Sequence, residues 1–241
     1  MLEPIPLILV AALVVLFGAI VQSGVGFGVG LIAAPYLVWT LPGTMPATLI
    51  MIGGMLALIT LVIERRSVDL RWLGWGLFGR LPGTALGTLL MVVASKQLLG
   101  LLIGIIVLIA SVLQWRRWQV ALNSRNVGIA GIISGTTGTV SGIGGPPMAM
   151  VMASETGPRV RGTLAAFFVA GSTMSLITLA PTGNVTGYHF LHALVLLPAL
   201  GLGAALGRPL ARYLDSGRTK AAILILAGVS GIVLAVTSVI G

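Results

Sequence analysis

Serine, threonine, glycine and proline gather in one stretch of an otherwise apolar chain, Ser134 to Pro147, which reads S-G-T-T-G-T-V-S-G-I-G-G-P-P. Inside a helix, glycine costs about 1 kcal/mol relative to alanine and proline about 3 kcal/mol, so we expect a helix to break here. The first N–H groups of the helix after a break have no intrahelical partner, and together with the helix macrodipole they attract anions. The stretch is therefore a candidate anion-binding site.

A second glycine-rich interruption lies in the apolar segment 4–40. This segment is too long for one ordinary membrane span, so we expect it to bend at its glycines. For any single glycine or hydroxyl residue, the alternative role is close helix packing. The candidate substrate-binding residues of the two interruptions are Gln22, Ser23, Gly24, Gly26, Gly28, Gly30, Thr137, Gly138, Ser141, Gly142, Gly144, Gly145 and Pro146.

Arg80 completes this candidate set, because it is the charge that lies well inside a predicted span. Burying an ion in a bilayer is costly, and such residues mark functional sites by default. An anion near the membrane midplane is a sensible partner, and packing against backbone carbonyls at Pro82 is an equal alternative. His189 and His192 lie one helical turn apart, where interfacial packing is favoured over proton transfer.

The acidic residues all fall in or near the polar links between apolar segments: Glu3, Glu64, Asp69, Glu155 and Asp215. No carboxylate is then available inside a span to bind Na⁺ or relay a proton. With no cysteine and two histidines, we propose no metal and no cofactor. Neither a Ser/His/Asp set nor a pair of intramembrane acids is present in one layer, so an enzyme is not expected.

Composition places the chain in a membrane. Of 241 residues, 57% are hydrophobic and 8% are charged, and the mean hydropathy is +1.10. A soluble domain carries about 25% charged residues. The net charge of +9 is read as loop topology and not as a nucleic-acid surface, because no basic tail or soluble basic domain is evident. Residues 1–20 have neither a basic start nor a small-residue cleavage site, so we expect this segment to be retained.

The chain also repeats itself. Sliding by 116 residues places G-F-G-V-G from Gly26 on G-I-G-G-P from Gly142, and sliding by 120 places G-T-A-L-G from Gly83 on G-A-A-L-G from Gly203. The alternative is coincidence, because 34 residues are glycine. We predict a first repeat over 1–118, a cytoplasmic linker over 119–125 and a second repeat over 126–241.

Besides the two broken segments, the apolar runs predict spans at 45–63, 72–93, 97–115, 162–181, 188–207 and 221–240. If both broken segments crossed the membrane fully, the loop charges would divide six against seven. If 126–154 instead dips in and returns, twelve of thirteen lie on one face, with Lys96 opposite. The second arrangement obeys the positive-inside rule. The counted charges are Arg65, Arg66, Arg71, Lys96, Arg116, Arg117, Arg125, Arg159, Arg161, Arg208, Arg212, Arg218 and Lys220.

These patterns predict an all-α polytopic membrane protein. Its two repeats are inverted, and each consists of a glycine-broken re-entrant helical hairpin plus three transmembrane helices. The charge count does not test the first broken segment, so its re-entrant form rests on the repeat alone and a full span remains the alternative. Inverted repeats with discontinuous helices that meet near the midplane are a recurring design of secondary transporters.

The motifs resemble those of the TauE/SafE sulfite exporter family of bacterial membrane permeases. The resemblance rests on G-F-G-V-G from Gly26 followed by Pro35, on G-I-G-G-P-P from Gly142, and on P-G-T-A-L-G from Pro82; the first motif departs from the usual G-x-G-G-G at Val29. It covers nearly the whole chain. It implies transport of sulfite, sulfonates or related small oxyanions across the bacterial inner membrane.

We therefore expect a multi-pass secondary transporter that moves a small sulfur-containing anion by alternating access. An anion channel that uses the same central site is the alternative, and a non-transporting membrane scaffold is a third. The expected partners are the anionic substrate and the lipid bilayer, with no nucleic acid. The oligomeric state is open, with a homodimer as one option, and so are the direction of transport and the coupling ion.

Overall fold

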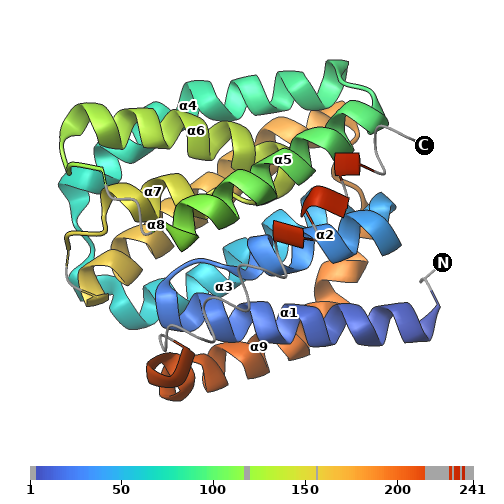
Figure 1. Cartoon of the computed structure of the whole chain (residues 1–241), viewed down its shortest axis with the longest axis horizontal. Helices are drawn as coiled ribbons and strands as arrows, with labels where there is room; N and C mark the ends of the chain where they lie inside the picture. The colour runs from blue at the N-terminus through green and yellow to red at the C-terminus, as the bar shows by residue number, and fades with distance from the viewer. Residues whose placement is uncertain are drawn as a thin grey trace.

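The structure, a computed structural model, describes residues 4–116, 120–155, 157–214, 228, 229, 231–233, 235 and 236. Every secondary-structure element named for these residues is a helix (Figure 1). The elements are α1 (Ile5–Val25), α2 (Val29–Thr40), η1 (Pro42–Thr44), α3 (Ala47–Glu64), η2 (Arg65–Ser67), α4 (Leu70–Val93), α5 (Lys96–Trp115), α6 (Ser124–Ser141), α7 (Gly145–Val151), α8 (Gly157–Leu179), η3 (Ala180–Thr182) and α9 (Gly187–Leu214).

Five segments of the described chain are long and apolar enough to cross a membrane: Ile5–Gly24, Ala47–Ser67, Leu70–Val93, Gly157–Thr182 and Gly187–Gly207. The prediction of an all-helical multi-pass membrane protein is confirmed at this level. The predicted spans 45–63, 72–93, 97–115, 162–181 and 188–207 correspond to α3, α4, α5, α8 and α9. Helix α9 continues to Leu214, so the predicted polar link at 208–220 begins inside a helix. Most of the predicted span 221–240 lies outside the described residues.

Both predicted helix breaks are confirmed. Helix α1 ends where Gly26 takes a left-handed backbone (φ 99°), and α6 ends in the same way at Gly142 (φ 73°). In each case the glycine N–H donates to the carbonyl four residues before it, Gln22 over 2.7 Å and Gly138 over 2.9 Å. Residues with a side chain rarely adopt this left-handed backbone conformation, so glycine is favoured at both positions.

Each break turns the chain back on itself to form a helical hairpin (Figure 1). Hairpin α1–α2 begins and ends at the right of the view, beside the N-terminus, whereas hairpin α6–α7 begins and ends at the left. The helix pair α3 and α8 also runs in opposite directions, and so does the pair α4 and α9. The two hairpins thus enter the bundle from opposite ends.

Small residues allow the helices of the bundle, including α1 and α6 of the hairpins, to pack closely. Helix α4 packs on α6, α9 packs on α1, and α3 packs on α8. A Cβ atom added at Gly83 of α4 would lie 2.2 Å from the Ile132 carbonyl oxygen, and one at Gly203 of α9 would lie 2.5 Å from the Leu16 carbonyl oxygen. Glycines on one helix that admit the backbone of another are typical of membrane helix packing.

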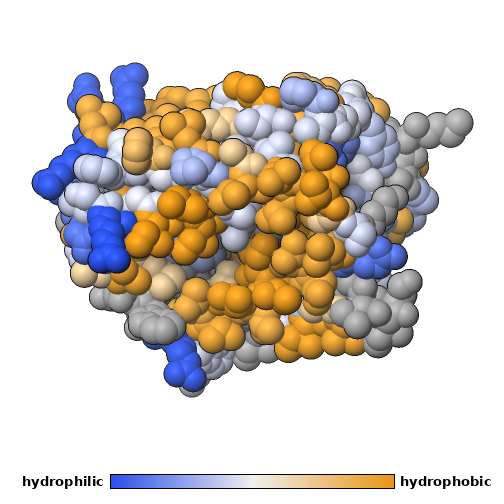
Figure 2. All heavy atoms as spheres, turned by 90° about the horizontal axis from the view of Figure 1, so that it is seen from above, coloured by the Kyte–Doolittle hydropathy of each residue, from blue (hydrophilic) through white to orange (hydrophobic). Residues whose placement is uncertain are grey.

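Charged side chains gather at one end of the bundle, where α3 ends and where α4 and α8 begin. Arg161 Nη2 lies 3.0 Å from Glu64 Oε1, and Arg159 pairs with both Asp69 and Glu155. Strongly hydrophilic atoms are concentrated at the left of Figure 2, and apolar atoms cover much of the remaining face. This distribution suits a bundle whose sides face lipid and whose charged end faces water.

Candidate functional site

The two helix breaks meet inside the bundle. A Cβ atom added at Gly30, in the first turn of α2, would lie 2.6 Å from the Gly142 carbonyl oxygen. One added at Gly145, the first residue of α7, would lie 2.7 Å from the Phe27 Cβ atom. The two hairpins are therefore in direct contact, and a residue other than glycine fits at these two points only if its neighbours move.

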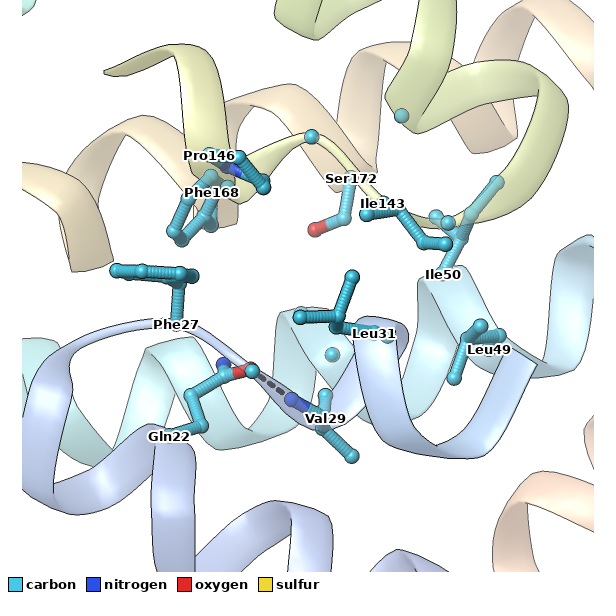
Figure 3. A pocket seen from close by; sticks show the side chains of 18 of the residues that line it. Gln22, Phe27, Val29, Leu31, Leu49, Ile50, Ile143, Pro146, Phe168 and Ser172 are labelled. Carbon is cyan, nitrogen blue, oxygen red and sulfur yellow. Dashed lines mark hydrogen bonds between the residues drawn. The ribbon is translucent and has the colours of Figure 1, made fainter. Parts of the chain in front are cut away.

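A cavity of about 60 Å³ lies between the hairpins (Figure 3). A cavity needs a volume of about 10–15 Å³ to hold one water molecule, so this cavity has room for several waters or for one small polyatomic ion. Its walls are formed by Gln22, Phe27, Gly28, Val29, Gly30, Leu31, Leu49, Ile50, Gly53, Gly54, Arg80, Gly138, Gly142, Ile143, Gly144, Gly145, Pro146, Phe168 and Ser172.

Arg80 reaches this cavity from the middle of α4 and is 3% exposed. Its Nη1 atom donates to the Ser134 hydroxyl over 3.2 Å, and its guanidinium carbon lies 4.8 Å from the centre of the Phe167 ring. Its Nε atom has no hydrogen-bond partner among the described residues. At Gly171 an added Cβ would lie 2.0 Å from Nε, so α8 must be bare there to admit the guanidinium.

Ser134 connects this cation to the second break. Its hydroxyl accepts from Arg80 and donates to the Gly144 carbonyl. The same hydroxyl oxygen would lie 2.9 Å from a Cβ atom added at Gly144. A larger residue at position 144 would therefore require its neighbours to move. A buried cation and a helix break are thereby held by one side chain.

The first break satisfies its own backbone. The Gln22 side-chain oxygen accepts the Val29 N–H over 3.0 Å, which caps the start of α2 (Figure 3). In the second hairpin the residue 116 positions later is Gly138, which has no side chain to act in this way. Pro146 and Pro147 have no N–H, so Gly144 and Gly145 supply the backbone donors that open α7.

Nine of the fourteen predicted site residues line the cavity: Gln22, Gly28, Gly30, Arg80, Gly138, Gly142, Gly144, Gly145 and Pro146. The structure thus brings together residues from three separate parts of the sequence. Their role in binding stays a prediction.

The other five predicted residues do not line it: Ser23, Gly24, Gly26, Thr137 and Ser141. Ser23 lies against Gly207 of α9. Ser141 Oγ donates to the Thr137 carbonyl and accepts from the Ile143 N–H, and Thr137 Oγ1 donates to the Ile133 carbonyl. The hydroxyl groups of Thr137 and Ser141 thus bond to the backbone within and just after α6, whereas that of Ser23 has no partner among the described residues.

Sequence reasoning missed the walls contributed by α3 and α8. Ile50 and Gly54 of α3 and Phe168 and Ser172 of α8 all line the cavity, and Gly54 lies against Ser172. The Ser172 hydroxyl points toward the space between the hairpins (Figure 3). These residues belong to ordinary spans with no distinguishing motif. Ser134 was also absent from the predicted set, although it opens the glycine-rich stretch 134–147 and lies one helical turn before Gly138.

The described titratable residues outside the cavity provide no candidate metal centre. No group of three His, Cys, Asp or Glu side chains among the described residues lies close enough to hold a metal ion. The Nδ1 atoms of His189 and His192 are engaged near the start of α9, with Thr186 and with the Tyr188 carbonyl.

A comparison with protein families matches residues 10–234 to the family described as "Sulfite exporter TauE/SafE". No curated protein and no solved structure matches the chain. The family match covers the two hairpins, Arg80 and the walls of the cavity, and it confirms the resemblance read from the glycine motifs.

Proposed function

The chain belongs to the TauE/SafE sulfite exporter family of membrane transporters, and we propose that it moves a small sulfur-containing anion, such as sulfite or an organosulfonate, by alternating access. The anion binds in the cavity between the two hairpins, beside Arg80. The membrane is the bacterial inner membrane, which is the location that the family resemblance implies.

The buried guanidinium of Arg80 carries this proposal. No ion pair joins it to an acid among the described residues, and one of its nitrogen atoms has no partner there. Leaving a cation buried and unpaired is expensive, even after protein relaxation and water penetration. A bound anion removes this cost, because it supplies both the opposite charge and the missing hydrogen-bond acceptors.

Backbone N–H groups contribute less to the proposed anion site than the sequence suggested. We expected the unpaired N–H groups after each break to attract the anion, but Gln22 already occupies the Val29 N–H at the first break. At the second break two prolines remove two donors, and α7 is seven residues long. The proposed site therefore depends chiefly on Arg80, with the Gly144 and Gly145 backbone and neutral side chains orienting the anion.

Two inverted repeats, at 1–118 and 126–241, complete the proposal, and matched contacts support them. Gly83 meets the Ile132 carbonyl, and Gly203 meets the Leu16 carbonyl. Gly203 follows Gly83 by 120 residues, while Ile132 follows Leu16 by 116 residues, which are the two offsets found in the sequence. The opposite directions of the hairpins in Figure 1 agree with this relation.

This geometry supports the proposal of alternating access. The cavity lies where hairpins from opposite ends overlap, so a small rocking of one repeat against the other opens it to one side at a time. The arginines in η2 and near the start of α8 lie at one end of the bundle, and we assign this end to the cytoplasm by the positive-inside rule.

Purified protein in liposomes tests the function directly. Uptake of radiolabelled sulfite should saturate with concentration, should be inhibited by an excess of unlabelled organosulfonate, and should be absent from protein-free liposomes. A steady current far above carrier turnover would select the anion channel instead. Liposomes that move no anion under any gradient would contradict transport and favour a scaffold.

A further inference from the structure

We infer that the cavity between the hairpins selects singly charged oxyanions over doubly charged oxyanions of the same size and shape. This inference rests on the proposed function, since it concerns the anion that the same cavity binds. It follows from the number of formal charges in the cavity wall, from the arrangement of helix ends around it, and from the apolar side chains that line it.

Arg80 is the one charged side chain in the described wall of the cavity. Every other side chain that lines it is neutral, and most are apolar or glycine. Helix α8, which contributes Phe168 and Ser172 to the wall, also carries Arg159 and Arg161. These two arginines are paired with Asp69, Glu155 and Glu64 at the charged end of the bundle. The wall thus offers one positive charge.

The second repeat does not supply a matching cation. The 120-residue offset that relates Gly83 to Gly203 also relates Arg80 to Leu200. Leu200 is fully buried and belongs to the apolar core. Leu200 does not line the cavity, so the second half supplies no cation at the position that corresponds to Arg80, and the cavity wall is asymmetric in charge.

The helix ends around the cavity do not add a second unit of positive charge. A helix start carries roughly half a positive charge and a helix end roughly half a negative charge. At each break, the end of one helix stands beside the start of the next: α1 beside α2, and α6 beside α7. These partial charges largely offset each other, and Gln22 further occupies the start of α2.

A singly charged guest therefore leaves the cavity neutral, whereas a doubly charged guest leaves one negative charge uncompensated. The surrounding wall includes Phe27, Leu31, Ile50 and Phe168, which offer that charge no hydrogen bonds. Uncompensated charge is costly in such surroundings because the interaction with water has been removed. The NH2 group of the Gln22 amide can orient an oxygen but adds no charge, and the Ser172 hydroxyl already donates to the Val169 carbonyl over 3.1 Å.

Methanesulfonate and sulfate form the matched test pair, because both are tetrahedral and of similar size but carry one and two charges. Their affinities for the purified full-length protein are measured by calorimetry at one neutral pH and constant ionic strength. We expect methanesulfonate to bind about tenfold tighter or more. Equal binding, or tighter binding of sulfate, would overturn the inference.

Variants separate this inference from the proposed function. Arg80→Gln should abolish methanesulfonate binding, Arg80→Lys should weaken it while keeping the preference for one charge, and the exposed Arg125→Gln should leave it unchanged. Sulfate binding that equals methanesulfonate binding and is lost in Arg80→Gln would refute the charge preference but keep the anion site. If methanesulfonate, sulfate and sulfite all fail to bind the wild-type protein, the proposed function fails as well. The wild-type comparison decides the charge preference even if Arg80→Gln does not fold.

Discussion

The Arg80 guanidinium donates a hydrogen bond to the Ser134 hydroxyl over 3.2 Å, and this bond links the buried cation of α4 to the break between α6 and α7. Ser134 in turn donates to the Gly144 carbonyl. One hydroxyl therefore holds the cation and the second break in register. The anion site depends on this arrangement, because the guanidinium and the backbone donors must face the same small cavity.

Ser134→Ala tests this link. Without the hydroxyl, the guanidinium loses its partner and the Gly144 carbonyl loses its donor. We expect the affinity for sulfite to fall about tenfold, since leaving buried polar groups unsatisfied costs about 1–3 kcal/mol. Binding is measured by calorimetry. Ser111→Ala is the control, because that buried hydroxyl bonds within its own helix, to the Val107 carbonyl. Equal affinities for the two variants would show that Ser134 does not position Arg80.

Gly30→Ala tests the contact between the hairpins. The added methyl group would lie 2.6 Å from the Gly142 carbonyl oxygen, so the hairpins must separate. Overpacking of this kind costs about 1–3 kcal/mol, and we expect a lower melting temperature together with weaker anion binding. In Gly74→Ala nothing lies within 4 Å of the new atom. That variant should be stabilised by up to about 1 kcal/mol through helix propensity. A Gly30→Ala protein as stable as Gly74→Ala would contradict the close approach.

Gly87→Ala and Gly207→Ala test the repeat. The new Cβ atoms would lie 2.8 Å from the Thr136 carbonyl oxygen and 2.5 Å from the Ile20 carbonyl oxygen, in contacts that the two sequence offsets relate. Both variants should lose stability to a similar extent, about 1–3 kcal/mol. Gly201→Ala, in open space on the same helix as Gly207, should not. Thermal unfolding in detergent measures all three, and a loss confined to one repeat would argue against equivalent packing.

Asp69 makes the charged end of the bundle sensitive to acid. Partial burial raises the pKa of Asp69, but hydrogen bonds from the Trp72 N–H and from Arg159 outweigh it, and the pKa lies below its ordinary value of 3.8. The ionised carboxylate therefore stabilises the fold above about pH 3.8, and this contribution is lost as the pH falls through that value toward the lower pKa of the folded state.

Asp69→Asn isolates this effect, because asparagine can still cap α4 but cannot ionise. Between about pH 6 and about pH 3, the melting temperature of the wild-type protein should fall more steeply than that of Asp69→Asn. The two curves should converge at the acid end. Parallel curves over the whole range would mean that the charge of Asp69 does not contribute to stability.

The glycine pattern made the two breaks predictable from the sequence. Gly26 and Gly142 occupy left-handed positions that favour glycine, and each lies within a long apolar run, so a break was the simplest interpretation. The burial of Arg80 was predictable for a similar reason, because no polar link lies near it in the sequence. The helices followed from the apolar runs, since lipid imposes their length.

The walls of the cavity were not predictable in the same way. Phe168 and Ser172 line it because α8 presents one particular face to α3, and the direction of a helix face depends on packing that the local pattern does not encode. The same cause explains why Ser23 and Thr137, although close to the breaks in sequence, point elsewhere. The use of Gln22 as a cap was missed because its partner, Val29, lies on the far side of the break.

The location of the bound anion tests the central claim most directly. Crystals of the protein soaked in selenite, the selenium analogue of sulfite, would reveal the anion by its anomalous scattering. The chain has no cysteine to react with selenite. We predict one strong peak between the hairpins, within about 4 Å of the Arg80 guanidinium and beside Gly144. A peak found instead among the arginines at the charged end, with none between the hairpins, would contradict the account.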